Sequence, residues 1–369
     1  MRIAIIGQGL LAPKEISMHQ DGDVSYYGAS LPKEKEDEIR LLAQENSRYS
    51  SLDRCALMAI LAGRRAVKDA GWEEDASIGI NIGSSRGATG LIEHYHEAFL
   101  QKNTALSPLS SPTTTAGNIS SWVAQDIGSK GIHFTHSITC SSALHAIANA
   151  SAWLRSGMAK RFIAGGSEAP LTPFTIAQMR ALRIYTSSAI RSFPCRPFTL
   201  EKNSMTLGEG AGLFALESEE SSNSRALAFI SGIGFASEAI EHPTSVSKNG
   251  EALYQAMKMA MRDAKRDVDL IITHAPGTLS GDRSELAAID RLFASRPYLY
   301  SNKWRYGHTL GASGALSLAE GITIFKTQQA PIFPFETILK QSVPSKIQTI
   351  LINSIGFGGN AVSLFLEQN

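Results

Sequence analysis

Cys140 stands where an apolar run gives way to the small residues Ser141 and Ser142, which open a predicted helix. A helix N-terminus presents unpaired N–H groups and the positive end of the helix dipole, so a thiolate there would be stabilised and an oxyanion could be bound. We interpret Cys140 as a candidate nucleophile. The alternative is a buried structural cysteine, which is the commoner role of this residue type.

Two histidines occupy comparable places later in the chain. His274 follows an apolar strand in the sequence HAPGT, and His308 precedes the small-residue run TLGASG. Two imidazoles could donate hydrogen bonds to one carbonyl oxygen on which negative charge develops. Lys303 lies in the strand predicted to enter the His308 loop, where it either tunes nearby proton affinities or is a solvated edge charge. Neither histidine belongs to an HxH or HExxH pattern, so no metal site is predicted.

Composition excludes several classes of protein. The chain has 369 residues, 43% of them hydrophobic, and a net charge of +1, which favours a folded domain and gives no overall attraction to nucleic acid or membranes. Its three cysteines form no CxxC pair, so we expect a reducing compartment. No apolar run is long enough to cross a bilayer, and the first is too short for a signal peptide. We therefore expect a cytoplasmic protein.

The two halves of the chain echo each other. In each half a helical stretch ends in Asp-Ala and leads into an apolar strand, then a strand enters a small-residue turn and a helix, and a last strand ends in glycines. Alternating strands and helices predict an α/β fold with a mostly parallel sheet. The corresponding segments are 51–70 and 251–264, 78–82 and 269–273, 134–140 and 298–303, and 161–166 and 349–359.

Taken together, the motifs resemble those of the β-ketoacyl-[acyl carrier protein] synthases, in particular the elongating enzymes with a Cys-His-His set. The resemblance covers essentially the whole chain. It implies a thiolase-like fold of two duplicated βαβαβ halves in an αβαβα arrangement, with the nucleophile in residues 1–220 and the histidines in residues 225–369. The matching segments are ITCSSALHAI around Cys140, AGGSEA at 164–169, CRPF at 195–198, LGEGAG at 207–212, the two histidine segments, and NSIGFGG at 353–359.

The resemblance also implies a chemical role for each matched residue. Cys140 would accept an acyl group from an acyl carrier thioester, and His274 and His308 would stabilise the enolate left when a malonyl thioester loses CO2. The product would be a 3-oxoacyl chain two carbons longer, and no metal or redox cofactor would be needed beyond the carrier's phosphopantetheine. Lys303 matches the family's lysine, the N–H groups of Cys140 and Phe357 would form an oxyanion hole, and Phe357 would gate the site. Substrate-binding positions would be Thr278, Phe198, Phe357 and Gly358.

Some positions depart from the family pattern. Pro276 stands in the loop after His274 and removes an N–H and a hydroxyl that would face the phosphopantetheine arm. Ser317 replaces a glutamate that would join the Lys303 network, and Glu320 lies one helical turn later. Asn360 comes one residue early. These changes point to a divergent member, in a polyene or polyketide pathway or in fatty acid synthesis.

Other functions remain open at this stage. The main alternative is a non-condensing, chain-length-setting partner of a ketosynthase heterodimer, although such subunits usually lack the active cysteine. A thiolase would need a second catalytic cysteine late in the chain, and a plain binding module would leave the strand-end residues unexplained.

The expected partners follow from the same resemblance. A homodimer or a heterodimer with a related subunit would pair through the segment 134–140, and an acidic acyl carrier protein would meet a basic rim. Candidates for that rim are Arg64, Arg65, Lys68, Arg191, Arg196 and Lys202.

Overall fold

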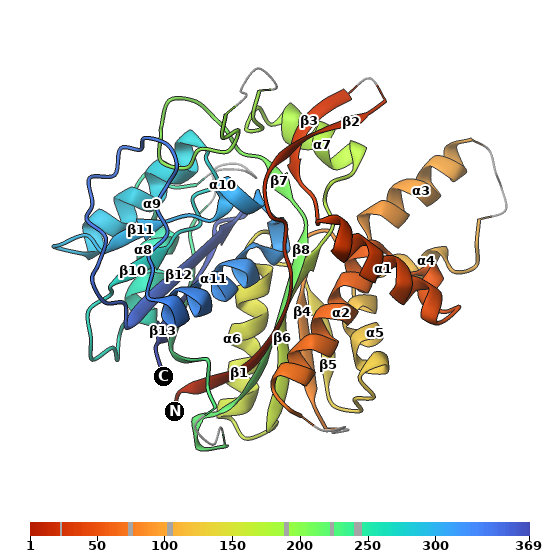
Figure 1. Cartoon of the computed structure of the whole chain (residues 1–369), viewed down its shortest axis with the longest axis horizontal. Helices are drawn as coiled ribbons and strands as arrows, with labels where there is room; N and C mark the ends of the chain where they lie inside the picture. The colour runs from red at the N-terminus through yellow and green to blue at the C-terminus, as the bar shows by residue number, and fades with distance from the viewer. Residues whose placement is uncertain (23, 73–76, 102–105, 188–191, 222–224, 240–245) are drawn as a thin grey trace.

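The computed structural model of the chain describes residues 1–22, 24–72, 77–101, 106–187, 192–221, 225–239 and 246–369 (Figure 1). A ten-stranded sheet runs through the molecule, in the order β11-β10-β12-β13-β9-β1-β8-β6-β4-β5. Its strands are β1 (Ile3–Leu11), β4 (Gly79–Gly83), β5 (His133–His136), β6 (Arg161–Glu168), β8 (Gly210–Ser218), β9 (Ala228–Ser237), β10 (Leu270–Ile272), β11 (Tyr298–Tyr300), β12 (Thr349–Gly356) and β13 (Asn360–Glu367).

The sheet consists of two five-stranded halves with the same topology, which confirms the predicted duplication. In the first half, β4 lies between β5 and β6 and pairs with both in parallel, β8 pairs antiparallel with β6, and β1 pairs antiparallel with β8. In the second half, β10 lies between β11 and β12 in the same way, β13 pairs antiparallel with β12, and β9 pairs antiparallel with β13. The antiparallel pair β1 and β9 joins the halves. The expectation of a mostly parallel sheet was wrong, because β8 and β13 each run opposite to the other four strands of their half, so that five of the nine strand pairings are antiparallel. The domain boundary at residues 220–225 stays a prediction.

Helices cover both outer faces of the sheet and fill the layer between its halves (Figure 1). One outer cluster packs α2 and α5 on the first half, a central cluster packs α6 and α11 between the halves, and a third packs α8 and α9 on the second half. This is the expected αβαβα arrangement. The helices of these layers are α2 (Arg54–Asp69), α5 (Asn118–Asp126), α6 (Ser142–Arg155), α8 (Glu251–Ala260), α9 (Leu279–Leu292) and α11 (Ser313–Thr327).

The alternating apolar residues of the strands explain the layers. On β1, Ile3 and Ile5 face the central cluster, whereas Ala4 and Ile6 face the outer one. Successive side chains of a strand point to opposite faces, so a strand buried on both sides must be apolar throughout. Both strand faces therefore need helices over them, and the sequence supplies these between the strands.

The remaining elements lie around this core. A small sheet and the short helix α7 sit at one end of the molecule, while α1, α3 and α4 extend beside α2 (Figure 1). No helix within the described ranges is long and apolar enough to cross a membrane. These elements are β2 (Ser17–Asp21), β3 (Val24–Ala29), β7 (Leu207–Gly208), α1 (Lys33–Glu45), α3 (Thr89–Leu100), α4 (Ser110–Thr114), α7 (Pro173–Ala181), α10 (Lys303–Tyr306), and the 3-10 turns η1 (Tyr49–Ser51), η2 (Glu219–Ser221) and η3 (Leu310–Ala312).

Two predicted segments end earlier than expected. The strand predicted over 298–303 ends at Tyr300, and Lys303 begins the single turn α10 instead of lying in the strand. The strand predicted over 134–140 is only β5, which ends at His136. In both cases the chain turns early, so the reactive residue stands on a loop or turn beyond the strand.

Close packing between α2 and β1 generates a stability prediction. A Cβ at Gly9 would lie 1.9 Å from the carbonyl oxygen of Ala62, within the helix backbone. We expect Gly9→Ala to lower the free energy of unfolding by roughly 3 kcal/mol, because the helix must move away from the strand. Gly117→Ala is the control, since a Cβ there meets nothing within 4 Å. Chemical denaturation measures both, and equal midpoints for the two variants would contradict the prediction.

Candidate active site

The predicted catalytic residues gather at the carboxyl ends of the strands. Cys140 follows β5, His274 follows β10, and Lys303 and His308 follow β11. Phe357 follows β12. In open α/β sheets ligands bind at this edge, so the topology brings the candidate residues together.

The nucleophile loop is fixed against the turn between β12 and β13. Thr139 Oγ1 donates to the carbonyl oxygen of Phe357 at 3.1 Å, and Ser354 Oγ donates to that of Cys140 at 3.1 Å. Thr139 has a left-handed backbone (φ 48°), which marks a sharp turn directly before the nucleophile. A Cβ at Gly356 would collide with Thr139 Oγ1, so glycine is required where the two halves touch. Phe357 therefore lies beside the cysteine loop, as its expected gating role needs.

Burial outweighs the helix N-terminus at Cys140. The residue precedes α6 as expected, yet its exposed fraction is 8%, and burial raises the pKa of the thiol to about 12. The nearby Glu168 also raises this pKa, whereas Lys303 and Arg86 lower it. The expectation of a stabilised thiolate was therefore wrong for this state of the protein, in which Cys140 is a neutral thiol.

Apolar side chains surround the thiol. Cys140 belongs to a buried cluster with two residues of α7, Ile176 and Met179. The other members come from β7 and the segment before it, and from the turn after His308. An apolar wall at a nucleophile suits an aliphatic chain better than a polar or charged substrate. The remaining members are Tyr185, Met205, Leu207 and Leu310.

The two histidines form a pair of neutral imidazoles. Their ring centroids are 5.1 Å apart and their planes stand at 87°. Burial lowers the pKa of His308 to about 3, and it lowers the pKa of His274 well below its usual value, with further contributions from His308 and Lys303. Nδ1 of each ring is buried and has no hydrogen-bond partner among the residues that the structure describes. Two neutral rings at right angles can each offer one N–H to a single oxygen atom.

Backbone contacts hold each histidine. The N–H groups of His274 and Ala275 donate to the buried carboxylate of Glu285 on α9, at 3.0 and 2.8 Å. The N–H of His308 donates to the carbonyl oxygen of Thr206 at 2.7 Å. A Cβ at Gly208 would lie 1.9 Å from the carbonyl oxygen of Tyr306, so only glycine lets the two backbones approach. The ring positions are thus set by main-chain bonds.

Lys303 is a buried cation with neutral hydrogen-bond partners. Its side chain is 1% exposed, and Nζ donates to the carbonyl oxygen of Thr273 at 3.3 Å and to Ser317 Oγ at 3.5 Å. Among the described residues no carboxylate forms an ion pair with it. Burial lowers the pKa of Lys303 to about 8, although the charge of Glu285 opposes this shift.

Glu320 does not take the place of the missing glutamate. Its carboxylate accepts from Tyr306 Oη at 3.0 Å and pairs with Arg305 at 3.3 Å. Ser317, one turn earlier on α11, is fully buried and faces Lys303. The sequence departure at this position therefore has a direct consequence for the charge around Lys303.

The expected substrate-binding positions fall into two groups. Thr278 and Gly358 lie on the loops that follow His274 and Phe357, and Thr278 N donates to Asp282 Oδ1 at 3.2 Å. Phe198 is different. Its ring is fully buried in the outer core and lies 6.3 Å from the ring of Phe333. The structure gives Phe198 a packing role, and its contact with substrate stays a prediction.

Several side chains of the expected basic rim already have partners within the chain. Arg64 forms ion pairs with Asp126 and Glu45, and Arg65 pairs with Glu38. Arg196 lies over the ring of Phe335. Lys68 and Lys202 are exposed, and Arg191 lies outside the described residues. Only part of the proposed set is therefore available to a partner.

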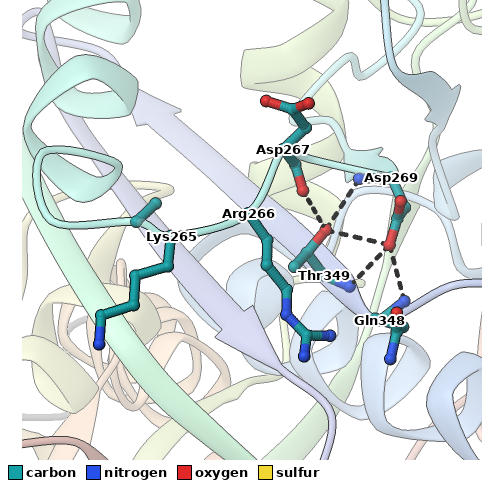
Figure 2. Close-up of a pocket in the computed structure, with 7 residues that line it drawn as sticks. Lys265, Arg266, Asp267, Asp269, Gln348 and Thr349 are labelled. Carbon is teal, nitrogen blue, oxygen red and sulfur yellow. Dashed lines mark hydrogen bonds between the residues drawn. The ribbon is translucent and has the colours of Figure 1, made fainter.

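A pocket of about 530 Å³ lies away from these residues (Figure 2). It opens where β10 and β12 begin, at the opposite ends of these strands from His274 and Phe357. Asp269 accepts from the N–H groups of Gln348 and Thr349 at 2.7 and 3.0 Å, so its carboxylate joins the two strands. The pocket contains none of the predicted catalytic residues. Within the described ranges no three His, Cys, Asp or Glu side chains are grouped to hold a metal ion.

Sequence reasoning missed the buried acids that support the site. Glu168, Asp282 and Glu285 received no role, although Glu168 lies in the segment AGGSEA and the other two follow the loop after His274. The sequence feature that could have indicated them is a carboxylate at the end of a strand or in the first turns of a helix, next to a glycine-rich loop. In the structure each accepts several backbone N–H groups.

Family models and relatives match most of the chain. The model for the beta-ketoacyl synthase N-terminal domain matches residues 13–222, and that for the C-terminal domain matches residues 227–334. A relative from Staphylococcus aureus named 3-oxoacyl-[acyl-carrier-protein] synthase 2 is 32% identical, over 85% of this chain and 82% of its own length. Nodulation protein E from a Rhizobium species is 32% identical, over 89% of this chain and 87% of its own length.

Solved structures show the same fold. The ishigamide ketosynthase/chain length factor matches with a TM-score of 0.86 at 22% identity, covering 100% of this chain and 99% of the other. A beta-ketoacyl synthase from Burkholderia phymatum matches with a TM-score of 0.84 at 24% identity, covering 100% and 99%. With both domain models and the relatives spanning most of its length, the chain belongs to the β-ketoacyl synthase family and is an acyltransferase of the 3-oxoacyl-[acyl-carrier-protein] synthase type.

Proposed function

We propose that this protein condenses an acyl group held on Cys140 with a malonyl group on an acyl carrier protein, with loss of CO2. The observation that carries the proposal is the neutral pair His274 and His308 on the same strand edge as the nucleophile. The phosphopantetheine of the carrier would deliver both substrates, and no separate cofactor is needed.

The first half-reaction transfers the acyl chain. Sγ of Cys140 attacks the thioester carbon, and the carrier's sulfur leaves with the proton that the thiol gives up. Because Cys140 is a neutral thiol at rest, proton loss must accompany attack. The N–H groups of Cys140 and Phe357 would bind the oxyanion, and the apolar cluster around Cys140 would hold the chain.

The second half-reaction forms the new carbon–carbon bond. The malonyl C–CO2 bond breaks, and its electron pair passes to the thioester oxygen as an enolate. His274 and His308 would donate N–H bonds to that oxygen, and the charge of Lys303 would favour it. The enolate carbon attacks the acyl carbon, the C–S bond to Cys140 breaks, and the released sulfur takes up a proton. The product is a 3-oxoacyl chain two carbons longer.

Partners follow from the fold and from the names of similar structures. Those names include a ketosynthase in complex with its chain length factor and one in complex with its acyl-carrier protein. Here β5 lies at the edge of the sheet, and among the described strands it pairs with β4 alone. We propose that β5 pairs with a second ketosynthase-like chain, as a homodimer or a heterodimer.

Acylation of Cys140 tests the first half-reaction. Incubation with acyl carrier thioesters of several lengths should add one acyl mass to the wild-type protein and none to Cys140→Ala, because the thiol is the attachment point. Intact-protein mass spectrometry measures the adduct. Absence of an adduct with every primer would contradict the proposal and favour the non-condensing, chain-length-setting subunit.

Decarboxylation tests the histidines separately. We expect His274→Ala and His308→Ala to retain acylation of Cys140 but to release CO2 from malonyl carrier roughly 100- to 1000-fold more slowly, since each removes a donor to the enolate oxygen. A carbon-14 release assay measures the rate. Wild-type rates in both variants would exclude the proposed role.

Ser317 permits a matched test of Lys303. The pKa of Lys303 is about 8, so the cation is lost as the pH rises through that value, and decarboxylation should fall above it. Ser317→Asp places a carboxylate beside Nζ and should raise this pKa, moving the fall to higher pH by about one unit or more. Ser317→Asn is the neutral control of the same size. The rate of CO2 release is measured as a function of pH for both variants. Identical pH profiles for Ser317→Asp and Ser317→Asn would refute the prediction.

A further inference from the structure

Glu168, the last residue of β6, is a buried acid that none of the proposed steps uses. It has no exposed surface. Oε1 accepts from Ser84 Oγ at 3.0 Å and from Arg86 N at 3.1 Å, and Oε2 accepts from Ser85 N at 2.6 Å and Gly311 N at 2.9 Å. Four donors around one carboxylate satisfy the buried charge and fix its place.

These bonds join the two halves of the chain. Ser84 to Arg86 follow β4 in the first half, whereas Gly311 lies three residues after His308 in the second half. The contact leaves no spare room, because a Cβ at Gly311 would lie 2.3 Å from Ser85 N and 2.5 Å from Glu168 Oε2. Leu310, between His308 and Gly311, has a left-handed backbone (φ 41°). The carboxylate therefore fixes a strained turn that continues the histidine loop.

The same strand end lies against the nucleophile's helix. A Cβ at Gly166 would be 2.7 Å from Cβ of Ala143, which is three residues after Cys140, and 2.9 Å from the carbonyl oxygen of Gly311. Of the charged groups with the largest effect on the Cys140 thiol within the described part of the chain, Glu168 opposes ionisation, whereas Lys303 and Arg86 favour it. One side chain thus bonds directly to the loop of His308 and acts on Cys140 through its charge.

We propose that Glu168 is a positioning residue for the condensation, with two separable effects: its bond to Gly311 holds the His308 loop in place, and its negative charge restrains the reactivity of Cys140. This inference rests on the proposed roles of Cys140 and His308. The charge keeps the free thiol protected between turnovers, while the bond keeps the enolate donors aligned.

Two substitutions separate the effects. In Glu168→Gln the amide oxygen can take the place of Oε2, where it still accepts from Ser85 and Gly311, while the charge is lost. In Glu168→Asp the charge remains, but the side chain is one methylene shorter and cannot reach both loops. Glu217→Gln is the matched control, since Glu217 is another buried acid of the same strand pair, opposite Arg161 at the far end of β6.

Alkylation by iodoacetamide measures the charge effect and needs no carrier substrate. At pH 8.5 the Glu168 carboxyl, whose pKa burial raises to about 7, is ionised. We expect Cys140 in Glu168→Gln to react about tenfold faster than in the wild type, which corresponds to one unit of pKa. Glu217→Gln should react at the wild-type rate. Peptide mass spectrometry assigns the label to Cys140, apart from Cys55 and Cys195.

Decarboxylation of malonyl carrier measures the bond to Gly311. We expect the rate to fall about 10- to 100-fold in Glu168→Asp, and to fall less in Glu168→Gln, because a displaced donor costs more than a lost charge. Thermal unfolding shows whether each variant is folded. If Glu168→Asp is not folded, the alkylation rate of Glu168→Gln still tests the inference.

Two results would overturn the inference: equal alkylation rates in the wild type and Glu168→Gln, or equal decarboxylation rates in the wild type and Glu168→Asp. Failure of the proposed function would look different. In that case Cys140 would take no acyl group from any carrier, while the alkylation rates would still differ between the variants.

Discussion

The site depends on three buried carboxylates that bind backbone N–H groups of the loops. Glu285 holds the loop of His274, Asp282 accepts from Gly277 and Phe198, and Glu168 holds Gly311 beyond His308. A buried carboxylate is costly unless donors surround it, so each acid requires its loops to stay where they are. The imidazole rings of His274 and His308 are thereby placed by main-chain geometry.

In this arrangement the thiol and the two imidazoles are uncharged. Burial keeps both imidazoles neutral and Cys140 protonated, and it brings the pKa of Lys303 down to about 8. A chemistry whose intermediates are anions gains most in such a place, because each N–H donor and the cation of Lys303 act on the developing charge through a poorly screening interior. The resting enzyme needs no ion pair that the reaction would have to break.

The sequence was sufficient for the architecture and for the identity of the strand-end residues. Short apolar runs such as those around Ile80 and Ile271 are typical of strands buried on both faces, and their repetition in two halves predicted the duplicated fold. The order of antiparallel strands could not be predicted, because it depends on how β8 and β13 return to the sheet. Lys303 was misplaced because the apolar run ends at Tyr300, and a single helical turn leaves no periodic pattern.

The protonation states of the site residues could not be predicted from the sequence, because they depend on packing by distant segments. A helix start after Cys140 indicated a stabilised thiolate, but its burial comes from α7 and from Met205 and Leu207, all distant in sequence. Phe198 lies in a motif shared with the site, yet only packing decides that its ring faces the core. The type and position of a side chain are local properties, whereas the charge that it carries depends on the whole enclosure around it.

The two departures from the family pattern act on one network. Ser317 leaves Lys303 with a carbonyl and a hydroxyl as partners, so Glu285 becomes the carboxylate whose charge does most to keep it protonated. Glu285 also anchors the backbone of His274 and Ala275, directly before Pro276. Pro276 has no N–H to donate. The loop is therefore held by the hydrogen bonds to Glu285 and by those from Gly277 and Thr278 to Asp282. One acid therefore supports both the histidine and the cation, beside both positions that depart from the family pattern.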